Sequence, residues 1–214
     1  MTRNQSVQEA RDSMNDPNDT SGSPEAPPES EEPRRLFLMG QKLYLRPLEE
    51  SDIGPEYVNW LNDHDVTRYM GTGRFPSTKE SIRKFLSRFE NSTTDLALAI
   101  IDREQNQHIG NVTLNHINWI DRTADTGLMI GRKEFWGKGY AYEAWRLILT
   151  YAFSQLGLRK VVAGAVVENV ASVGTLRKLG FKLEGTFREE VLVDGKPCDT
   201  ARFGLLRREF QSDV

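Results

Sequence analysis

The chain has 214 residues, a formal net charge of −3 and 38% hydrophobic residues, which is typical of an ordinary folded protein. It has no apolar run of about 18 residues, which argues against a membrane-spanning helix, and its near-neutral charge argues against nucleic acid as the main partner. One cysteine excludes an internal disulfide, and the three histidines lack metal-ligand spacing, so no metal site is expected. The polar N-terminus carries no secretory signal, so we expect a cytoplasmic protein.

Residues 1–35 differ in composition from the rest of the chain. They hold five of the nine prolines, eight acidic residues and four arginines, with almost no large apolar side chain. Such a segment cannot bury enough apolar surface to offset the entropy of ordering it. We therefore predict a disordered, acidic, proline-rich tail at 1–35, with a partner-binding arm as the alternative, and one folded domain at 36–214.

The predicted elements of that domain mix strands and helices. A first strand at 43–48 precedes a short helix capped by Asp52, and a capping box at 77–80 begins a second helix. Strands are then predicted at 95–102, 108–120 and 124–131. The later elements are an amphipathic helix from 140 to about 156 that ends at Gly157, a strand at 160–167, a helix from Asn169 to Gly180, and strands at 182–193 and 199–207 joined by Asp194-Gly195. This order predicts a mixed α/β fold.

The segment EFWGKGYAYEA, residues 134–144, places two glycines between a predicted strand and a predicted helix. A helix start exposes unpaired N–H groups and the positive end of the dipole, and glycines let a phosphate approach them. A simple strand-to-helix turn is the other interpretation. The chain lacks a Walker GxxxxGK[ST] loop, and Tyr142 stands where a dinucleotide fingerprint needs its third glycine.

A second segment, NVASVGTLRKLGFKLEG at 169–185, follows after one further strand. Together, WGKGYAYEA and this segment resemble the two signature segments of the GNAT superfamily of acetyl-CoA-dependent N-acetyltransferases. The resemblance is to the branch that acetylates ribosomal-protein N-termini, spermidine and nucleotide-linked amino sugars. It covers about 43 to 207, nearly all of the predicted domain.

The resemblance implies an α/β fold with a GNAT-like mixed, mostly antiparallel central sheet and helices on both faces. The middle strands, 124–131 and 160–167, would splay apart and hold the co-substrate acetyl-CoA between them. The implied cofactor-binding residues are Leu128, Met129 and Ile130 beside the pantetheine arm, and Trp136, Gly137, Lys138, Gly139, Tyr140 and Ala141 around the pyrophosphate. Asn169 would hydrogen-bond the cofactor or the acceptor, and Ser172 would lie near the thioester sulfur.

The resemblance also implies that the acceptor amine attacks the thioester directly. The amine must be neutral, the oxyanion needs a donor such as a backbone N–H near Ile130, and the leaving thiolate needs a proton. Many relatives carry a tyrosine seven positions after the asparagine, where this chain has Leu176. Ser172 is the remaining candidate for the catalytic acid, although Ser172 and Asn169 also fit a local helix-start hydrogen bond and an N-cap.

His116 is the candidate catalytic base, because an imidazole titrates near neutral pH. Strand alternation predicts that it shares a face with Val112 and Leu114. A histidine on the sheet surface is the other interpretation of His116. The remaining candidates for the base are Asp121, Asp125 and Glu134.

The acceptor side is predicted at WLNDHDVTRYMGTGRFP, residues 60–76. Its Arg68, Tyr69, Arg74 and Phe75 can stack a nucleobase or hold a phosphate, which favours a nucleotide-linked amino sugar. A protein N-terminus, a polyamine and a non-catalytic acetyl-CoA-binding module remain alternatives. The expected partner is a small-molecule amine or a peptide N-terminus, with a homodimer kept open as the assembly.

Overall fold

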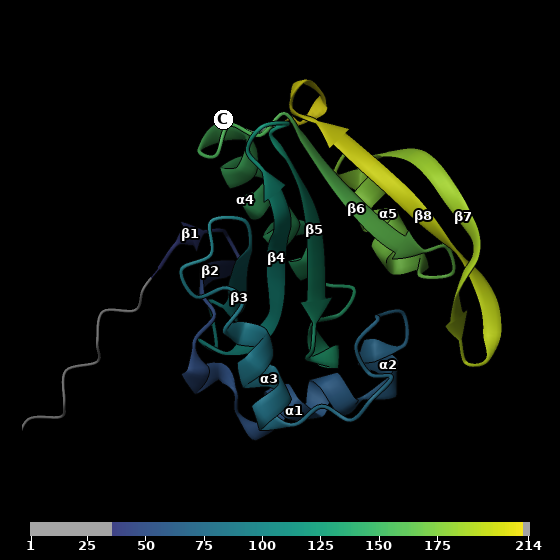
Figure 1. The fold of residues 1–214 in the computed structure, drawn as a ribbon. Helices are drawn as coiled ribbons and strands as arrows, with labels where there is room; N and C mark the ends of the chain where they lie inside the picture. Colours follow the sequence, from purple (N-terminus) through teal and green to yellow (C-terminus); the bar gives the residue numbers. More distant parts are fainter. Residues whose placement is uncertain (1–35, 212–214) are drawn as a thin grey trace, which may run out of the picture. The chain divides into compact units, whose positions relative to one another are not determined.

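The computed structural model describes residues 36–211, which form one sheet with helices on both faces (Figure 1). The predictions for 1–35 lie outside the described residues. The strands are β1 (Leu38–Met39), β2 (Leu43–Pro47), β3 (Leu96–Asp102), β4 (His108–Asn118), β5 (Thr123–Ile130), β6 (Lys160–Val166), β7 (Lys182–Val193) and β8 (Lys196–Leu206). The helices are α1 (Pro55–Asn62), α2 (His64–Thr67), α3 (Lys79–Leu86), α4 (Tyr140–Ser154) and α5 (Val170–Lys178), with 3-10 turns η1 (Glu50–Asp52), η2 (Lys133–Phe135) and η3 (Arg207–Glu209).

The strand order is β1-β2-β3-β4-β5-β6-β8-β7. Every neighbouring pair is antiparallel except β5 with β6, which run parallel. These two strands pair only at their beginnings, where 123–125 lie beside 160–162. Beyond that point β5 stays paired with β4 and β6 with β8, so the two middle strands diverge (Figure 1). The predicted splayed sheet is confirmed.

The two faces of the sheet bury different sets of helices. One face packs against α4 and α5, where Ile148, Leu149 and Leu176 are fully buried. The other face packs against α1 and α3 in a smaller cluster that includes Met129 of β5. Burying one such side chain fully stabilises the fold by about 1.5–3 kcal/mol. Strand β5 therefore lies between two apolar layers, whereas Val161, Ala163 and Ala165 of β6 belong to the first layer alone.

The structure corrects the predicted start of the first helix. Its N-cap is Gly54, and Pro55 opens the helix, because the fixed φ of proline suits the first helical position. Asp52 instead lies in η1 and forms an ion pair with Arg46, with Oδ1 and Nη2 at 2.6 Å. The helix that was predicted second is α3, and its capping box lies at Thr78 and Ser81, one residue later than predicted.

The last hairpin turns through Asp194-Gly195, as predicted. Both residues have positive φ, 51° and 75°, as a tight hairpin turn of this type requires. The Asp194 carboxylate lies 2.7 Å from His64 Nε2 and 2.9 Å from Arg68 Nη2, so the hairpin tip docks on α2 and its following residue. Strand β8 begins three residues before the predicted start, and sequence analysis predicted neither β1 nor α2.

Candidate active site

The gap between β5 and β6 is bordered by backbone groups of β5. Gly131 N donates to Ile109 O of β4 at 2.8 Å, and peptide groups alternate sides along a strand. The peptide groups of Met129 therefore face β4, where Met129 lies opposite Asn111. Those of Leu128 and Ile130 face the gap, so the expected pantetheine contacts narrow to these two residues, while Met129 pairs within the sheet.

The loop before α4 has the backbone that close approach of an anion requires. Gly137 and Gly139 have φ of 71° and 88°, which a side chain would strain. Gly139 is the N-cap of α4, and no side chain caps the helix. The first N–H groups of α4, at Tyr140 and Ala141, are therefore directed into the loop with no intrahelical partner.

Trp136 does not offer its N–H to this loop. That N–H donates to Lys133 O at 3.0 Å inside the η2 turn. The indole Nε1 donates to Ile130 O at 2.8 Å and ties the loop to the end of β5. The candidate anion-binding N–H groups therefore run from Gly137 to Ala141, one residue shorter than predicted.

Sequence analysis missed Lys42, which the fold brings to the same loop. Its Nζ donates to Lys138 O at 2.9 Å. It also lies 3.6 Å from the position that a Cβ on Gly139 would occupy. Lys42 and Lys138 are separated by 96 residues, so no local pattern could have joined them. Two cations next to an uncapped helix start suit a pyrophosphate.

The second segment opens α5 as predicted. The Oδ1 of Asn169 accepts a hydrogen bond from Ser172 N at 3.1 Å, so Asn169 is the N-cap of this helix. Both side chains are half-buried next to the end of β6. Leu176, at the position where relatives often have tyrosine, is fully buried in the main core and has no acidic proton. Ser172 remains the candidate acid of this segment.

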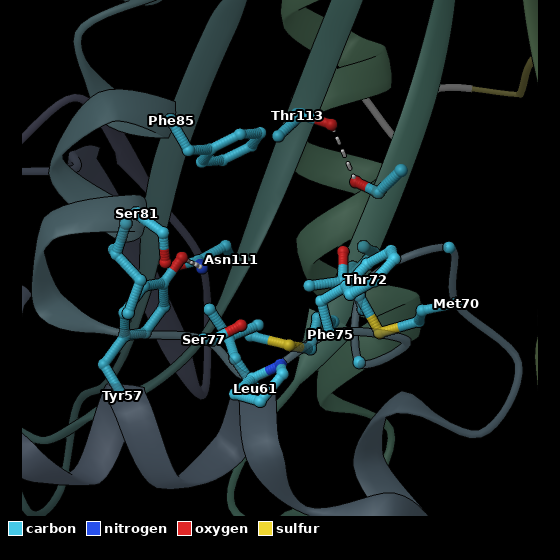
Figure 2. A pocket seen from close by; sticks show the side chains of 17 residues that line it. Tyr57, Leu61, Met70, Thr72, Phe75, Ser77, Ser81, Phe85, Asn111 and Thr113 are labelled. Atoms are coloured by element: carbon cyan, nitrogen blue, oxygen red, sulfur yellow. Dashed lines mark hydrogen bonds between the residues drawn. The ribbon is translucent and has the colours of Figure 1, made fainter.

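A pocket lies on the face of β4 and β5 that packs against α1 and α3, and we call it the acceptor pocket. Its volume is about 430 Å³. Figure 2 shows that its wall is built from α1, α3, β4 and the loop 70–77 around one space. Gly127 and Leu128 also line it, so the β5 segment that borders the gap is part of the pocket wall.

A polar network lies behind this pocket. Asn111 Nδ2 donates to Tyr57 Oη at 2.7 Å, and Asn111 Oδ1 lies 2.8 Å from His108 Nε2. His108 Nδ1 is 3.6 Å from Asp52, which Arg46 pairs. Burial lowers the pKa of His108 and raises the pKa of Tyr57 to about 12, so Tyr57 is a neutral phenol at pH 7. Sequence analysis did not single out this network.

His116 lies outside the acceptor pocket. It has φ of 53° at a β-bulge, where the register of β4 shifts between Asn115 and Asn118. The bulge breaks the predicted alternation, because Val112 and Leu114 are fully buried whereas His116 is exposed. The structure does not bring His116 to the gap or to the pocket.

The other candidate bases are also held by partners. Asp121 accepts from Asn118 Nδ2 at 2.9 Å in the β4–β5 turn. Asp125 pairs with Arg202 at 2.8 Å. The backbone N–H of Glu134 itself, together with Arg132, lowers the pKa of Glu134, which makes it a weaker base.

The predicted acceptor residues separate into two groups. Arg68 pairs with Asp194, and Tyr69 packs near Val166 in a cluster away from the acceptor pocket. Phe75 lines the acceptor pocket although 84% of its surface is exposed, and Arg74 precedes it on the exposed loop. Of these four residues, only Phe75 therefore lines the pocket.

A splayed sheet with an anion-accepting loop at one side and an acceptor pocket at the other defines an acyltransferase of the acyl-CoA-dependent class. Residues 42–182 match the sequence profile described as an acetyltransferase (GNAT) domain, so the chain belongs to the GNAT acetyltransferase family. The enzymes of this family use acetyl-CoA, as predicted. Lys42 and the Gly139 helix start fit its phosphates, and the Leu128 peptide groups and the Ile130 N–H fit its amide-bearing arm.

Known proteins similar to this chain are N-acetyltransferases. It is 31% identical over 176 residues to the uncharacterized N-acetyltransferase p20 of Bacillus licheniformis, covering 81% of this chain and 97% of p20. It is 36% identical over 104 residues to the putative ribosomal N-acetyltransferase YdaF of Bacillus subtilis, covering 49% of this chain and 56% of YdaF. The crystal structure of spermidine N-acetyltransferase from Vibrio cholerae in complex with CoA and spermine has a TM-score of 0.72 and 27% identity, covering 78% and 97% of the two chains.

No helix within residues 36–211 combines the length and the apolar character needed to cross a membrane.

Proposed function

We propose that this protein transfers the acetyl group of acetyl-CoA directly to a primary amine that sits in the acceptor pocket. The observation that carries the proposal is the position of Gly127 and Leu128. Both line the pocket, and the peptide groups of Leu128 face the gap between β5 and β6. An amine in the pocket and a thioester in the gap would therefore lie next to the same segment of β5. The amine can then attack the thioester directly, so no covalent enzyme intermediate is needed.

The pocket itself helps to supply a neutral amine. An ammonium with a pKa near 10.4 costs roughly 4.6 kcal/mol to deprotonate at pH 7, whereas an α-amine near 7.8 costs about 1 kcal/mol. Transfer into an apolar pocket disfavours the charged form and lowers the amine pKa further. A low-pKa amine can then lose its proton to water, without a side chain acting as a strong base.

The remaining roles fall to residues next to the gap. The Ile130 N–H faces the gap and is our candidate for oxyanion stabilisation. Ser172 is our candidate hydrogen-bond donor to the leaving thiolate. Substitution Ser172→Ala is expected to lower kcat and leave the affinity for acetyl-CoA unchanged. Equal kcat in the variant would remove Ser172 from the mechanism.

A nucleotide-linked amino sugar is a second candidate acceptor. It is favoured by Phe75 in the pocket wall, which suits a stacked base, and by the exposed Arg74 next to it in the chain, which suits a phosphate. A peptide N-terminus and a polyamine are further alternatives, in line with the relatives named for these activities.

The proposed activity is tested by thiol release from acetyl-CoA with a panel of amines, followed by mass spectrometry of the products. Amine-dependent thiol release and an acetylated product support transfer. Acetyl-CoA binding measured by calorimetry, with no thiol release on any amine, would instead support a non-catalytic acetyl-CoA-binding module.

A further inference from the structure

The acceptor pocket has a lining without ionisable carboxylates or cations. Among its 17 lining residues, all from the described part of the chain, none is Asp, Glu, Lys, Arg or His. Its wall is formed mainly by apolar side chains, including Leu61, Met70, Ile82, Phe85 and Met129. A cavity of about 430 Å³ with this lining fits a compact apolar group.

The polar side chains of the lining are largely committed to the protein. Asn111 uses both ends of its amide on Tyr57 and His108. Thr113 Oγ1 contacts Gly127 O and accepts from Asn115. The Ser81 hydroxyl donates to Thr78 O at 2.9 Å. Among the described residues, the hydroxyls of Thr72 and Ser77 form no side-chain hydrogen bond and stay available to a ligand. These two groups are few for the several hydroxyl groups of a sugar, and burying the others without partners costs free energy.

We propose that the acceptor is a primary amine carried on an apolar group, aromatic or branched aliphatic, and this inference rests on the proposed acetyl transfer. A polyamine would bring a second ammonium next to a lining with no carboxylate, and an unpaired buried charge is costly. An apolar group loses no hydrogen bonds there and gains from leaving water. The same chemistry can come from a free amine or from a peptide with an apolar first residue.

The proposed reaction needs no further reactant. The nitrogen of the neutral amine attacks the thioester carbonyl carbon, so a C–N bond forms and the C–S bond breaks. The amine nitrogen loses one proton to water, and the CoA thiolate takes up one proton. The products are an N-acetyl amide and CoA thiol.

The full chain is tested with acetyl-CoA and four probes: 2-phenylethylamine, a peptide with N-terminal phenylalanine, spermidine and glucosamine. We expect kcat/KM for one of the two apolar amines to exceed that for spermidine and glucosamine by at least about tenfold. The better of the two apolar probes identifies the source as a free amine or a peptide. A higher kcat/KM for spermidine or glucosamine would overturn the inference while leaving acetyl transfer intact. No turnover with any probe would overturn both.

A variant tests whether the pocket sets this preference. Phe85 lines the pocket from α3 and is 42% exposed, so the fold can accept a polar residue there. Phe85→Glu should lower kcat/KM for the apolar amine by at least about tenfold and raise it for spermidine. Phe85→Gln should lower kcat/KM for the apolar amine without raising kcat/KM for spermidine, because glutamine adds no charge. If Phe85→Glu leaves the ratio of kcat/KM between the apolar amine and spermidine unchanged, the inference is contradicted.

Phe89→Glu is the matched control. Phe89 packs against Phe85, with ring centroids 5.2 Å apart, but it does not line the acceptor pocket. The same change four residues along should leave the ratio of kcat/KM between apolar amine and spermidine as it is. An equal shift in Phe89→Glu would mean that the effect comes from surface charge and not from the pocket.

Discussion

The side-chain amide of Asn111 on β4 donates a 2.7 Å hydrogen bond to the hydroxyl of Tyr57 on α1. This bond joins the sheet to the helix that forms one wall of the acceptor pocket. Because Asn111 also meets His108, the orientation of Tyr57 depends on a residue that does not line the pocket. The network therefore holds the pocket wall in one arrangement.

Removing either partner of this bond should destabilise the protein. Asn111→Leu and Tyr57→Phe are each expected to lower the free energy of unfolding by about 1–3 kcal/mol, because a buried polar group is left without a partner. The double variant should lose less than the sum of the two losses. Urea unfolding of the four proteins measures this coupling. Strictly additive losses would show that the two side chains do not stabilise each other.

The glycine at the start of α4 gives a test of the phosphate site. Gly139→Asp puts a side chain and a negative charge where an anion would bind, so affinity for acetyl-CoA should fall by at least about a hundredfold. Isothermal calorimetry measures the affinity. Gly157→Asp is the matched control, because Gly157 also has positive φ, 65°, and lies after α4 with open space around it. Similar acetyl-CoA affinity in the two variants would show that the loop before α4 is a turn and does not bind the phosphates.

Lys42 should contribute to the same affinity through its charge. Lys42→Met keeps the length of the side chain but removes the ammonium that contacts Lys138 O. We expect acetyl-CoA affinity to fall by about three- to thirtyfold, and the loss to shrink as salt is added. Lys84→Met, on the exposed side of α3, is the control. A loss that does not depend on salt would point to packing and not to charge.

His108 should make stability depend on pH in a defined window. Burial lowers its pKa below the ordinary value of 6.5, although Asp52 opposes the shift. The unfolded chain therefore binds the proton first as the pH falls, and stability decreases from pH 6.5 down to the folded pKa. Burial would raise the pKa of Asp52, but the hydrogen bonds from Arg46 and from the Glu49 backbone outweigh burial and hold this pKa below its usual value.

His108→Gln should flatten the stability curve below pH 6.5, where wild-type stability falls because the folded pKa of His108 is lowered. Thermal unfolding across this range measures the slope. If His108→Gln keeps the wild-type slope of stability against pH, a group other than His108 takes up the proton on unfolding.

Local patterns in the sequence were enough to predict the backbone of the proposed cofactor side and the last hairpin turn. The glycines before α4, the N-cap of α5 and the Asp194-Gly195 turn each depend on residues a few positions apart. The acceptor side was not predictable in this way. Its wall combines α1, α3 and β4, and the bulge that exposes His116 breaks the alternation on which that prediction relied.

Asn169 allows capping to be separated from cofactor contact. Its Oδ1 caps α5 by accepting from Ser172 N, which leaves the amide NH2 as the group proposed to reach acetyl-CoA. Asn169→Asp keeps the cap, so the melting temperature should stay as it is while acetyl-CoA affinity falls. Asn169→Ala loses both functions and should also lose about 1 kcal/mol of stability. Calorimetry and thermal unfolding together decide between the roles. Wild-type affinity in Asn169→Asp would leave Asn169 as an N-cap alone, because this variant keeps the capping oxygen but has lost the amide donor.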